Sequence, residues 1–330
     1  MQDVRTCMSS HRPIFRKRRR LVIASLTGVV AFAGCGGGAS SRSSPLTTLR
    51  VGFVPVVEGA PLFIANQLGY FRQEHVEVQL DPLQNASSIA PSILNGQLQV
   101  GNIATVPYVL AVSKGLPLKA ISSVGKPSPG DSGIVVSPSS GIARPRDLAG
   151  KTVAVNQLDA VLQLVTSADI QKDGGDPSTT KFLALPLPAA ITAVQSGRVD
   201  AATVVEPFVT IARQDRLNII SHPYSDVLTP GTGIDVSITS TAYLASHRRA
   251  ISGFVRALDR ATRYAASHPQ AVREAVVQLL NLAPPLAQAI DLPTFDPSLT
   301  TASIEPTLRL MVKYGFLTKA PPPSALIASP

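Results

Sequence analysis

The side chains that could do chemistry lie in four short loops, each of which directly follows an apolar, strand-like run. The candidates are Glu58 and Gly59 in the first loop, Asn102 and Thr105 in the second, Asn156, Gln157 and Asp159 in the third, and Glu206 and Phe208 in the fourth. The loops offer three carboxylates but no lysine or arginine. Carboxylates form strong hydrogen bonds with cationic and N–H-bearing partners. This set therefore predicts a neutral, amine-bearing or cationic small ligand rather than an anion.

Several of these side chains also have a purely structural interpretation. Asp159 could cap the N-terminus of a helix, Glu206 could bond to a nearby backbone, and Glu58 directly precedes a helical stretch. Tyr108 and Phe208 could stack on a flat ligand, although Tyr108 also suits a place in the core. The residues alone leave these alternatives open.

Sequence signatures of catalysis and of metal binding are absent. The histidines are scattered and show no H-E-x-x-H spacing, which a zinc hydrolase would need. No G-x-S-x-G or Walker sequence occurs either. We therefore expect no catalytic residue, no metal and no cofactor.

Short apolar strands alternate with helical stretches along most of the chain. Strands are predicted at 49–54, 76–80, 98–101, 118–124, 133–136, 151–155, 181–183, 201–204, 217–220 and 234–238. Turn-rich breaks interrupt this alternation at 125–131 and 223–233. Two α/β halves with two breaks predict a two-lobed α/β fold, in which two parallel-type sheets flanked by helices are joined by two crossovers. Such a fold holds its ligand in a cleft between the lobes.

The breaks also predict the domain organisation. The first lobe should be discontinuous, with residues 49–128 and 234–318, and the second should contain residues 129–233. A proline-rich end, 319–330, is predicted to be a disordered tail. Few elements are expected to bridge the lobes, so hinges near 125–133 and 223–236 should let them close on a ligand.

The formal charge of +9 on this 330-residue chain is concentrated near the N-terminus. Residues 1–34 contain seven basic residues and one acid, which leaves 23 basic and 20 acidic residues in 35–330. A nucleic-acid-binding protein would carry its basic stripe in the folded part, and aromatic residues make up only 5% of the chain. No nucleic-acid partner is therefore expected.

A basic run, Arg16–Arg20, precedes an apolar stretch that is too short to span a bilayer. This order is typical of a secretory signal peptide, here residues 1–34. Phe32-Ala33-Gly34-Cys35 resembles a bacterial lipobox, which implies that Cys35 is lipidated and becomes the N-terminus. Residues 35–48 should then form a flexible tether. The protein is expected to be anchored by its lipid to the outer side of a cell membrane, and export by the general or the twin-arginine route is open. The lipid on Cys35 and the loss of Cys7 with the signal leave no pair for a disulfide.

Four stretches resemble the periplasmic-type solute-binding proteins of ABC importers, in the branch that binds nitrate, sulfonates, taurine and thiamine precursors. They are Gly59–Ala65 with Leu68–Phe71, Leu94–Gly101, Asp147–Val155, and Ala193–Ala202 with Glu206–Phe208. The resemblance implies a type II periplasmic-binding-protein fold, a monomer, a small-molecule ligand and an ABC permease in the membrane as partner. It places Thr105 and the loop 156–159 where family members often provide hydroxyl and amide contacts.

Two alternatives follow from the same resemblance. Sulfonate-binding members often have Ser-Thr in the loop where this sequence has Leu158-Asp159-Ala160, yet a sulfonate, taurine or nitrate binder stays open. An enzyme related to the thiamine-pyrimidine synthases is less favoured, because those enzymes carry a cysteine-rich iron motif and no cysteine follows Cys35. The sensor domain of a regulator is not favoured, because a signal and a tether take the place of its helix-turn-helix.

Overall fold

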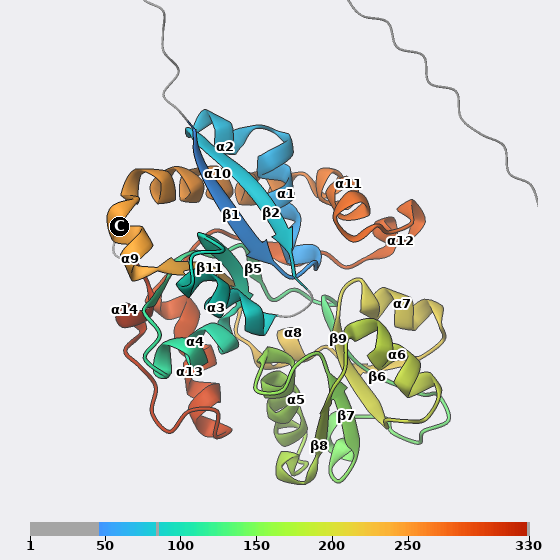
Figure 1. Cartoon of the computed structure of the whole chain (residues 1–330). Helices are drawn as coiled ribbons and strands as arrows, with labels where there is room; N and C mark the ends of the chain where they lie inside the picture. The colour runs from blue at the N-terminus through green and yellow to red at the C-terminus, as the bar shows by residue number, and fades with distance from the viewer. Residues whose placement is uncertain (1–45, 84–85, 329–330) are drawn as a thin grey trace, which may run out of the picture. The chain divides into compact units, whose positions relative to one another are not determined.

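The computed structural model describes residues 46–83 and 86–328 (Figure 1). The predicted signal peptide, Cys35 and most of the predicted tether lie outside the described residues. Two five-stranded sheets form the frame of the described part, so the two-lobed α/β fold predicted from the sequence is confirmed. No helix in this part is long and apolar enough to cross a membrane.

The first sheet is built from the N-terminal strands and one strand from much later in the chain. Its order is β2-β1-β3-β11-β4. The strands are β1 (Thr47–Phe53), β2 (Val76–Pro82), β3 (Val100–Ala104), β4 (Leu118–Ser122) and β11 (Asp235–Ser240). β1 includes the last two residues of the predicted tether, because Thr47 and Thr48 already pair with Val76 and Glu77.

The second sheet contains only strands from the middle of the chain. Its order is β10-β6-β9-β7-β8. The strands are β6 (Ser132–Val136), β7 (Thr152–Val155), β8 (Lys181–Ala184), β9 (Ala201–Val205) and β10 (Asn218–Ser221). A separate pair, β5 (Gly125–Lys126) and β12 (Thr294–Phe295), lies beside the first crossover.

Each sheet is parallel except for one strand. β11 runs antiparallel to β3 and β4, and β6 runs antiparallel to β9 and β10. Both are the strands by which the chain enters a sheet directly after crossing from the other lobe. The parallel-type sheets expected from the βαβ alternation therefore each contain one reversed strand. The parallel strands end on the side of the other lobe, so a chain that arrives from that lobe enters the sheet on this side and runs in the opposite direction.

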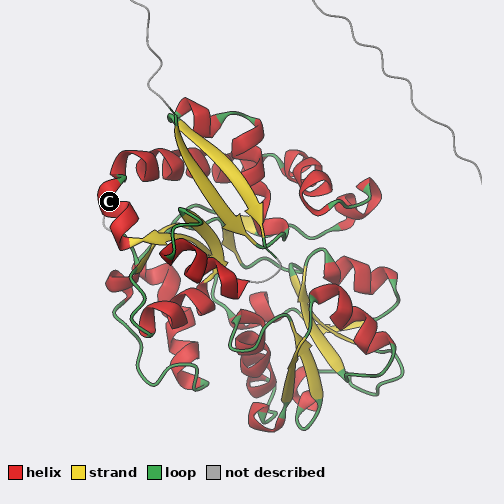
Figure 2. Ribbon diagram, viewed as in Figure 1, coloured by secondary structure: helices red, strands yellow, loops and turns green. Residues whose placement is uncertain are grey.

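Helices cover the sheets of both lobes (Figure 2). Those in the first lobe are η1 (Val57–Gly59), α1 (Ala60–Gln67), α2 (Tyr70–Gln73), η2 (Ala86–Ser88), α3 (Ile89–Leu94), α4 (Thr105–Ser113), α9 (Thr241–Ser246), α10 (Arg248–Ser267), α11 (Pro269–Leu280), α12 (Pro284–Ala289), α13 (Thr301–Lys313) and α14 (Pro323–Leu326). Those in the second are η3 (Pro145–Leu148), α5 (Val161–Lys172), η4 (Pro177–Thr179), α6 (Leu187–Gln195), α7 (Phe208–Gln214) and α8 (Pro223–Val227).

The long helix α10 shows how the apolar pattern is used. Ile251, Phe254, Leu258 and Ala261 recur every three or four positions and are all buried in one core cluster with β1 and β2. The Phe254 ring stacks on that of Phe71, with ring centroids 5.2 Å apart. This face therefore anchors α10 to the first sheet and to α2.

The two lobes also contact each other outside the two crossovers. One apolar cluster includes Leu164 and Val165 of α5 in the second lobe together with Ile304 and Leu308 of α13 in the first. Tyr314 Oη also donates a hydrogen bond to Gln171 Oε1, at 2.8 Å. A few helices, among them α5 and α13, therefore connect the lobes in addition to the two crossovers.

The C-terminal segment is packed rather than disordered, which corrects the prediction for 319–330 as far as Ala328. Leu326 is fully buried, and its carbonyl accepts a hydrogen bond from the Tyr108 hydroxyl. The Ala328 N–H donates to the carbonyl of Ala120, in the middle of the edge strand β4, at 2.8 Å. The tail is ordered because it covers an otherwise unpaired sheet edge and satisfies a buried tyrosine.

Candidate functional site

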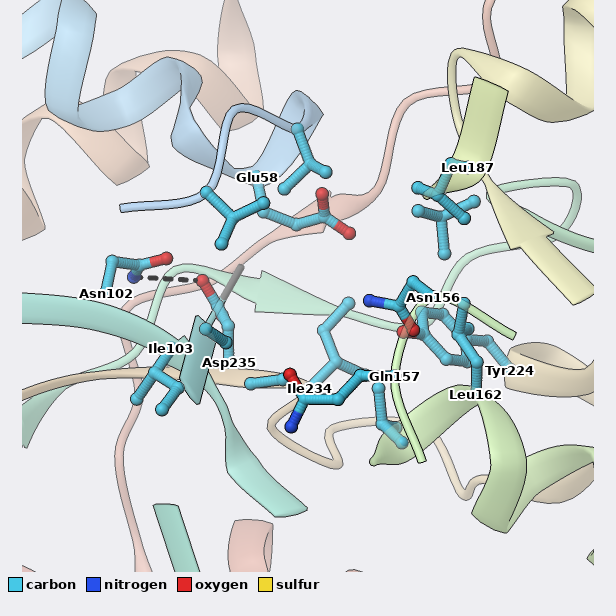
Figure 3. A pocket seen from close by; sticks show the side chains of 16 residues that line it. Glu58, Asn102, Ile103, Asn156, Gln157, Leu162, Leu187, Tyr224, Ile234 and Asp235 are labelled. Carbon is cyan, nitrogen blue, oxygen red and sulfur yellow. Dashed lines mark hydrogen bonds between the residues drawn. The ribbon is translucent and has the colours of Figure 1, made fainter. Parts of the chain in front are cut away.

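A cavity is lined by residues of both lobes, near the carboxyl ends of β1, β3, β7 and β9 (Figure 3). The cavity has a volume of about 120 Å³, which is several times the ~10–15 Å³ that one water molecule needs on the same measure. The first lobe contributes Val54, Val56, Glu58, Ala86, Asn102, Ile103, Ala104, Ile234 and Asp235. The second lobe contributes Asn156, Gln157, Val161, Leu162, Leu187, Val205 and Tyr224. The cavity therefore suits a small organic molecule.

Four of the residues predicted from the sequence line this cavity: Glu58, Asn102, Asn156 and Gln157. Three of them follow the end of a strand, whereas Asn102, predicted to lie in the loop after 98–101, lies inside a strand. Glu58 lies in η1 after β1, Asn102 is in β3, and the two other amides follow β7. The rule that ligand-facing loops follow strand ends therefore placed Glu58, Asn156 and Gln157 correctly, and Asn102 reaches the cavity from within its strand. The role of all four in binding stays a prediction.

Gly59 and Thr105 do not line the cavity. The Thr105 hydroxyl donates to the Gly233 carbonyl at 2.8 Å, and its N–H donates to the Ile234 carbonyl at 3.0 Å. This side chain therefore fixes the second crossover to the start of α4. A Cβ on Gly59 would face Leu279 and Phe53, so this glycine allows η1 to pack closely in the core.

Glu206 and Phe208 do not line the cavity either. Glu206 Oε1 accepts hydrogen bonds from the Thr210 hydroxyl at 2.8 Å and from the Asp291 N–H at 3.0 Å. Its Oε2 accepts from the Thr210 N–H at 3.1 Å. The structural interpretation of Glu206 therefore describes its contacts, and the carboxylate joins α7 to the segment that follows α12. Phe208 packs against the apolar cluster of the second lobe.

Asp159 is exposed; it does not cap α5 and is not among the residues that line the cavity. Its backbone has φ 54°, and its N–H donates to Gln163 Oε1 at 2.8 Å. The residue at the N-cap of α5 is Ala160, without a side-chain cap. The positive φ is in the left-handed region, which few residues other than glycine adopt.

Asp235 and Tyr224 line the cavity and were not predicted from the sequence. Asp235 Oδ1 accepts from the Gly125 N–H at 2.8 Å, and its Oδ2 accepts from Asn102 Nδ2 at 3.2 Å. The Tyr224 N–H donates to Ser132 Oγ at 2.9 Å, which fixes α8 to β6. An acid inside the apolar strand run 234–238 is the sequence signal that could have identified Asp235, because carboxylates are rarely buried without a purpose.

The carboxylates near the cavity share a low-dielectric environment. Burial, and then the neighbouring carboxylates of Asp235, Asp131 and Glu206, raises the pKa of Glu58 to about 8. Burial likewise raises the pKa of Asp131 to about 7, and it raises the pKa values of Glu206 and Asp235. Glu58 is therefore mostly protonated at neutral pH when the cavity holds no cation.

The buried cation nearest this group does not enter the cavity. Lys126 Nζ donates to the Ser298 carbonyl at 2.7 Å and to Ser123 Oγ at 3.2 Å. Desolvation lowers the pKa of this ammonium. None of the described residues that line the cavity is a lysine or an arginine, and no three His, Cys, Asp or Glu of the described part are placed to hold a metal ion.

Comparison with known proteins places this architecture in a family. The model of the NMT1/THI5-like family matches residues 57–272. The alkanesulfonate-binding protein SsuA from Xanthomonas axonopodis pv. citri, solved with bound MOPS, superposes with a TM-score of 0.74 at 18% identity, over 87% of this chain and 99% of that one. The fold is thus that of the periplasmic binding proteins, as the resemblance implied.

Three curated relatives are similar to this chain in sequence over part or most of their length. The chain is 25% identical over 146 residues to the taurine-binding periplasmic protein of Escherichia coli, which is 44% of each chain. It is 22% identical over 254 residues to a putative aliphatic sulfonates-binding protein of Bacillus subtilis, covering 75% of this chain and 74% of that one. It is 25% identical over 235 residues to the 4-amino-5-hydroxymethyl-2-methylpyrimidine phosphate synthase of Aspergillus parasiticus, covering 67% and 66%. The match thus spans less than half of the taurine-binding protein.

Proposed function

Because the chain belongs to the NMT1/THI5-like family, we propose that it is the solute-binding component of an ABC importer, which captures a small molecule between its lobes and delivers it to a membrane permease. The observation that carries the proposal is the cavity: side chains of both lobes line it, at the strand ends where this fold holds its ligands. The sulfonate- and taurine-binding relatives support transport as the function.

The ligand is a neutral or positively charged molecule. The polar side chains that line the cavity are Glu58, Asp235, Tyr224 and three amides, with no cationic side chain among the described ones. A bound sulfonate or nitrate would have amide and N–H donors but no counter-charge, and it would lie close to buried acids. The names of the relatives favour the alternative, a sulfonate, taurine or nitrate binder of the same fold.

A second candidate, an enzyme, is favoured by the Aspergillus relative, which is a pyrimidine phosphate synthase. Against it, this chain has no cysteine after Cys35 with which to form the cysteine-rich motif of such enzymes. The two candidates differ in the fate of the ligand: a binding protein releases it unchanged, whereas a synthase converts it.

A ligand screen tests the proposal. Amines, pyrimidines, sulfonates and nitrate would be added separately to the purified protein, and melting temperature and small-angle X-ray scattering would be recorded. We expect an amine or a pyrimidine to raise the melting temperature, by several degrees at saturation, to reduce the radius of gyration and to be recovered chemically unchanged. Stabilisation by sulfonates or nitrate alone would establish the alternative. A protein that no small molecule stabilises would contradict the importer role.

The lipid anchor is proposed from the sequence, since Cys35 lies outside the described residues. We expect Cys35→Ala to abolish incorporation of a labelled fatty acid and to leave the signal peptide uncleaved, because no other cysteine lies close to the apolar run. Metabolic labelling followed by electrophoresis measures both effects. Cys7→Ala is the matched control and should label like the parent protein; persistent labelling of Cys35→Ala would contradict the lipobox.

A further inference from the structure

The four buried carboxylates of Glu58, Asp131, Glu206 and Asp235 lie close enough to influence one another. Three of them already accept hydrogen bonds from the protein or lie outside the cavity. Both oxygens of Asp235 accept hydrogen bonds, from Gly125 and Asn102. Both oxygens of Glu206 accept them from Thr210 and Asp291. Asp131 accepts one from the Ser128 N–H at 2.8 Å and does not line the cavity.

The remaining carboxylate is that of Glu58, which lines the cavity and has one oxygen without a hydrogen-bond partner. Its exposed fraction is 8%, and Oε2 is buried without a hydrogen-bond partner among the described residues. Figure 3 shows the carboxylate reaching from η1 into the space between the lobes. A buried acceptor without a donor is costly, so a ligand that supplies a donor at this point gains affinity.

The second lobe contributes apolar side chains to the wall, beside the polar groups of Asn156, Gln157 and Tyr224. Val161 and Leu162, at the start of α5, and Leu187, at the start of α6, line the cavity from the second lobe. The amides of Asn156 and Gln157 follow β7 and are more exposed than the leucine at 162. A ligand that fits this arrangement has a hydrogen-bond donor at one end and an apolar body at the other.

We propose that Glu58 determines the chemical class of the ligand: its Oε2 accepts a hydrogen bond from the amino or ammonium group of an organic amine whose apolar body lies against Leu162 and Leu187. This inference rests on the proposed function, because it concerns the ligand of the same cavity. A sulfonate presents only acceptors, so it can accept the proton of the neutral Glu58 carboxyl but cannot pair with the ionised carboxylate, and it gains nothing from the negative potential of the neighbouring acids.

The pairing of Glu58 with an ammonium group should release a measurable proton. Glu58 carries a proton near neutral pH in the empty cavity, because its pKa is raised to about 8 by burial. Pairing with an ammonium favours the ionised carboxylate, so amine binding releases this proton. The titratable and charged groups around Glu58 are the carboxylates of Asp131, Glu206 and Asp235, the Tyr224 hydroxyl and the Lys126 ammonium beside Asp235. The acids stabilise the incoming cation and oppose an anion.

The test uses probes that share one apolar body: benzylamine, benzyl alcohol and phenylmethanesulfonate. Calorimetry on the purified protein near pH 7 should show affinity in the order amine, alcohol, sulfonate. Glu58→Gln should lower the affinity for benzylamine by about 10-fold or more, which corresponds to the loss of one charged hydrogen bond. The affinity for benzyl alcohol should stay nearly unchanged. Glu305→Gln is the matched control, because Glu305 is an exposed acid on α13 that pairs with Arg309; it should bind benzylamine like the parent.

Two further measurements keep the test decisive. Circular dichroism and the melting temperature without probe should show that Glu58→Gln is folded, since glutamine has the size of the protonated acid. Calorimetry in two buffers of different ionisation enthalpy should show proton release on benzylamine binding in the parent and none in Glu58→Gln.

The outcomes separate this inference from the proposed function. Equal benzylamine affinity in the parent and in Glu58→Gln, or tighter binding of the sulfonate than of the amine, overturns the role of Glu58 and leaves the solute-binding function intact. Failure of every probe here and of every compound in the broader screen overturns both.

Discussion

Raising the pH from about 5 to about 8 is expected to destabilise the ligand-free protein by a few kcal/mol, and Glu58→Gln is expected to remove much of this loss. The pKa of Glu58 is raised from its usual 4.5 to about 8 by burial. Between these two values the folded protein keeps a proton that the unfolded chain has released. The unfolded state then binds fewer protons, so the free energy of unfolding falls as the pH rises through this window, by up to ~1.4 kcal/mol for each step of one in pH.

The measurement is urea denaturation of the parent and of Glu58→Gln at a series of pH values. Asp131, with its pKa raised to about 7, acts in the same direction over a lower window, so a reduced slope should remain in the variant. Glu305→Gln, which removes an exposed acid, should keep the slope of the parent. Parallel profiles for parent and Glu58→Gln would show that the Glu58 carboxylate is well solvated in solution.

Phe254→Ala is expected to lower the free energy of unfolding by ~3–5 kcal/mol, the usual cost of deleting a buried aromatic side chain. The ring of Phe254 is fully buried, and it stacks on Phe71 at a centroid distance of 5.2 Å with an interplanar angle of 10°. Its removal leaves a cavity between α10, α2 and the first sheet, where the surrounding strands cannot collapse inward.

The denaturation midpoint in urea measures this loss, with an unchanged slope showing that the transition stays two-state. Leu183→Ala provides the control: Leu183 lies on β8 and is 41% exposed, so its truncation should change the free energy of unfolding by no more than ~0.5 kcal/mol. A loss below ~1.5 kcal/mol for Phe254→Ala would mean that the packing of α10 on the sheet is looser than the structure has it.

Local pattern predicted the elements well, because strands and helices leave a periodic signature in the chain. The period-two run at 76–80 lies in β2, and the apolar face from Ile251 to Ala265 lies in α10. The ordered tail escaped prediction because its order depends on a distant partner: Leu326 is held by Tyr108, more than two hundred residues earlier. No local pattern records such a contact.

The candidate site was predicted in part for a similar reason. Loop order placed Glu58, Asn156 and Gln157 correctly, since strand ends converge in this fold, and Asn102 lines the cavity from within β3. The sequence could not show which carboxylates form hydrogen bonds with the protein itself. Glu206 does so through Thr210 and Asp291. Asp159 has a left-handed backbone and is not among the lining residues, and Asp235 is the first residue of strand β11 and not part of a loop that follows a strand.

The place of β11 in the first sheet fixes the order in which the chain can fold as it is synthesised. β4 pairs within this sheet only with β11, and β11 also pairs with β3. β11 begins at Asp235, after every strand of the second sheet. While the polypeptide emerges N-terminus first, all strands of the second lobe are complete before the fourth strand of the first sheet has a neighbour to pair with. The inserted lobe can therefore form first, and the N-terminal lobe, although it is made earlier, is finished last.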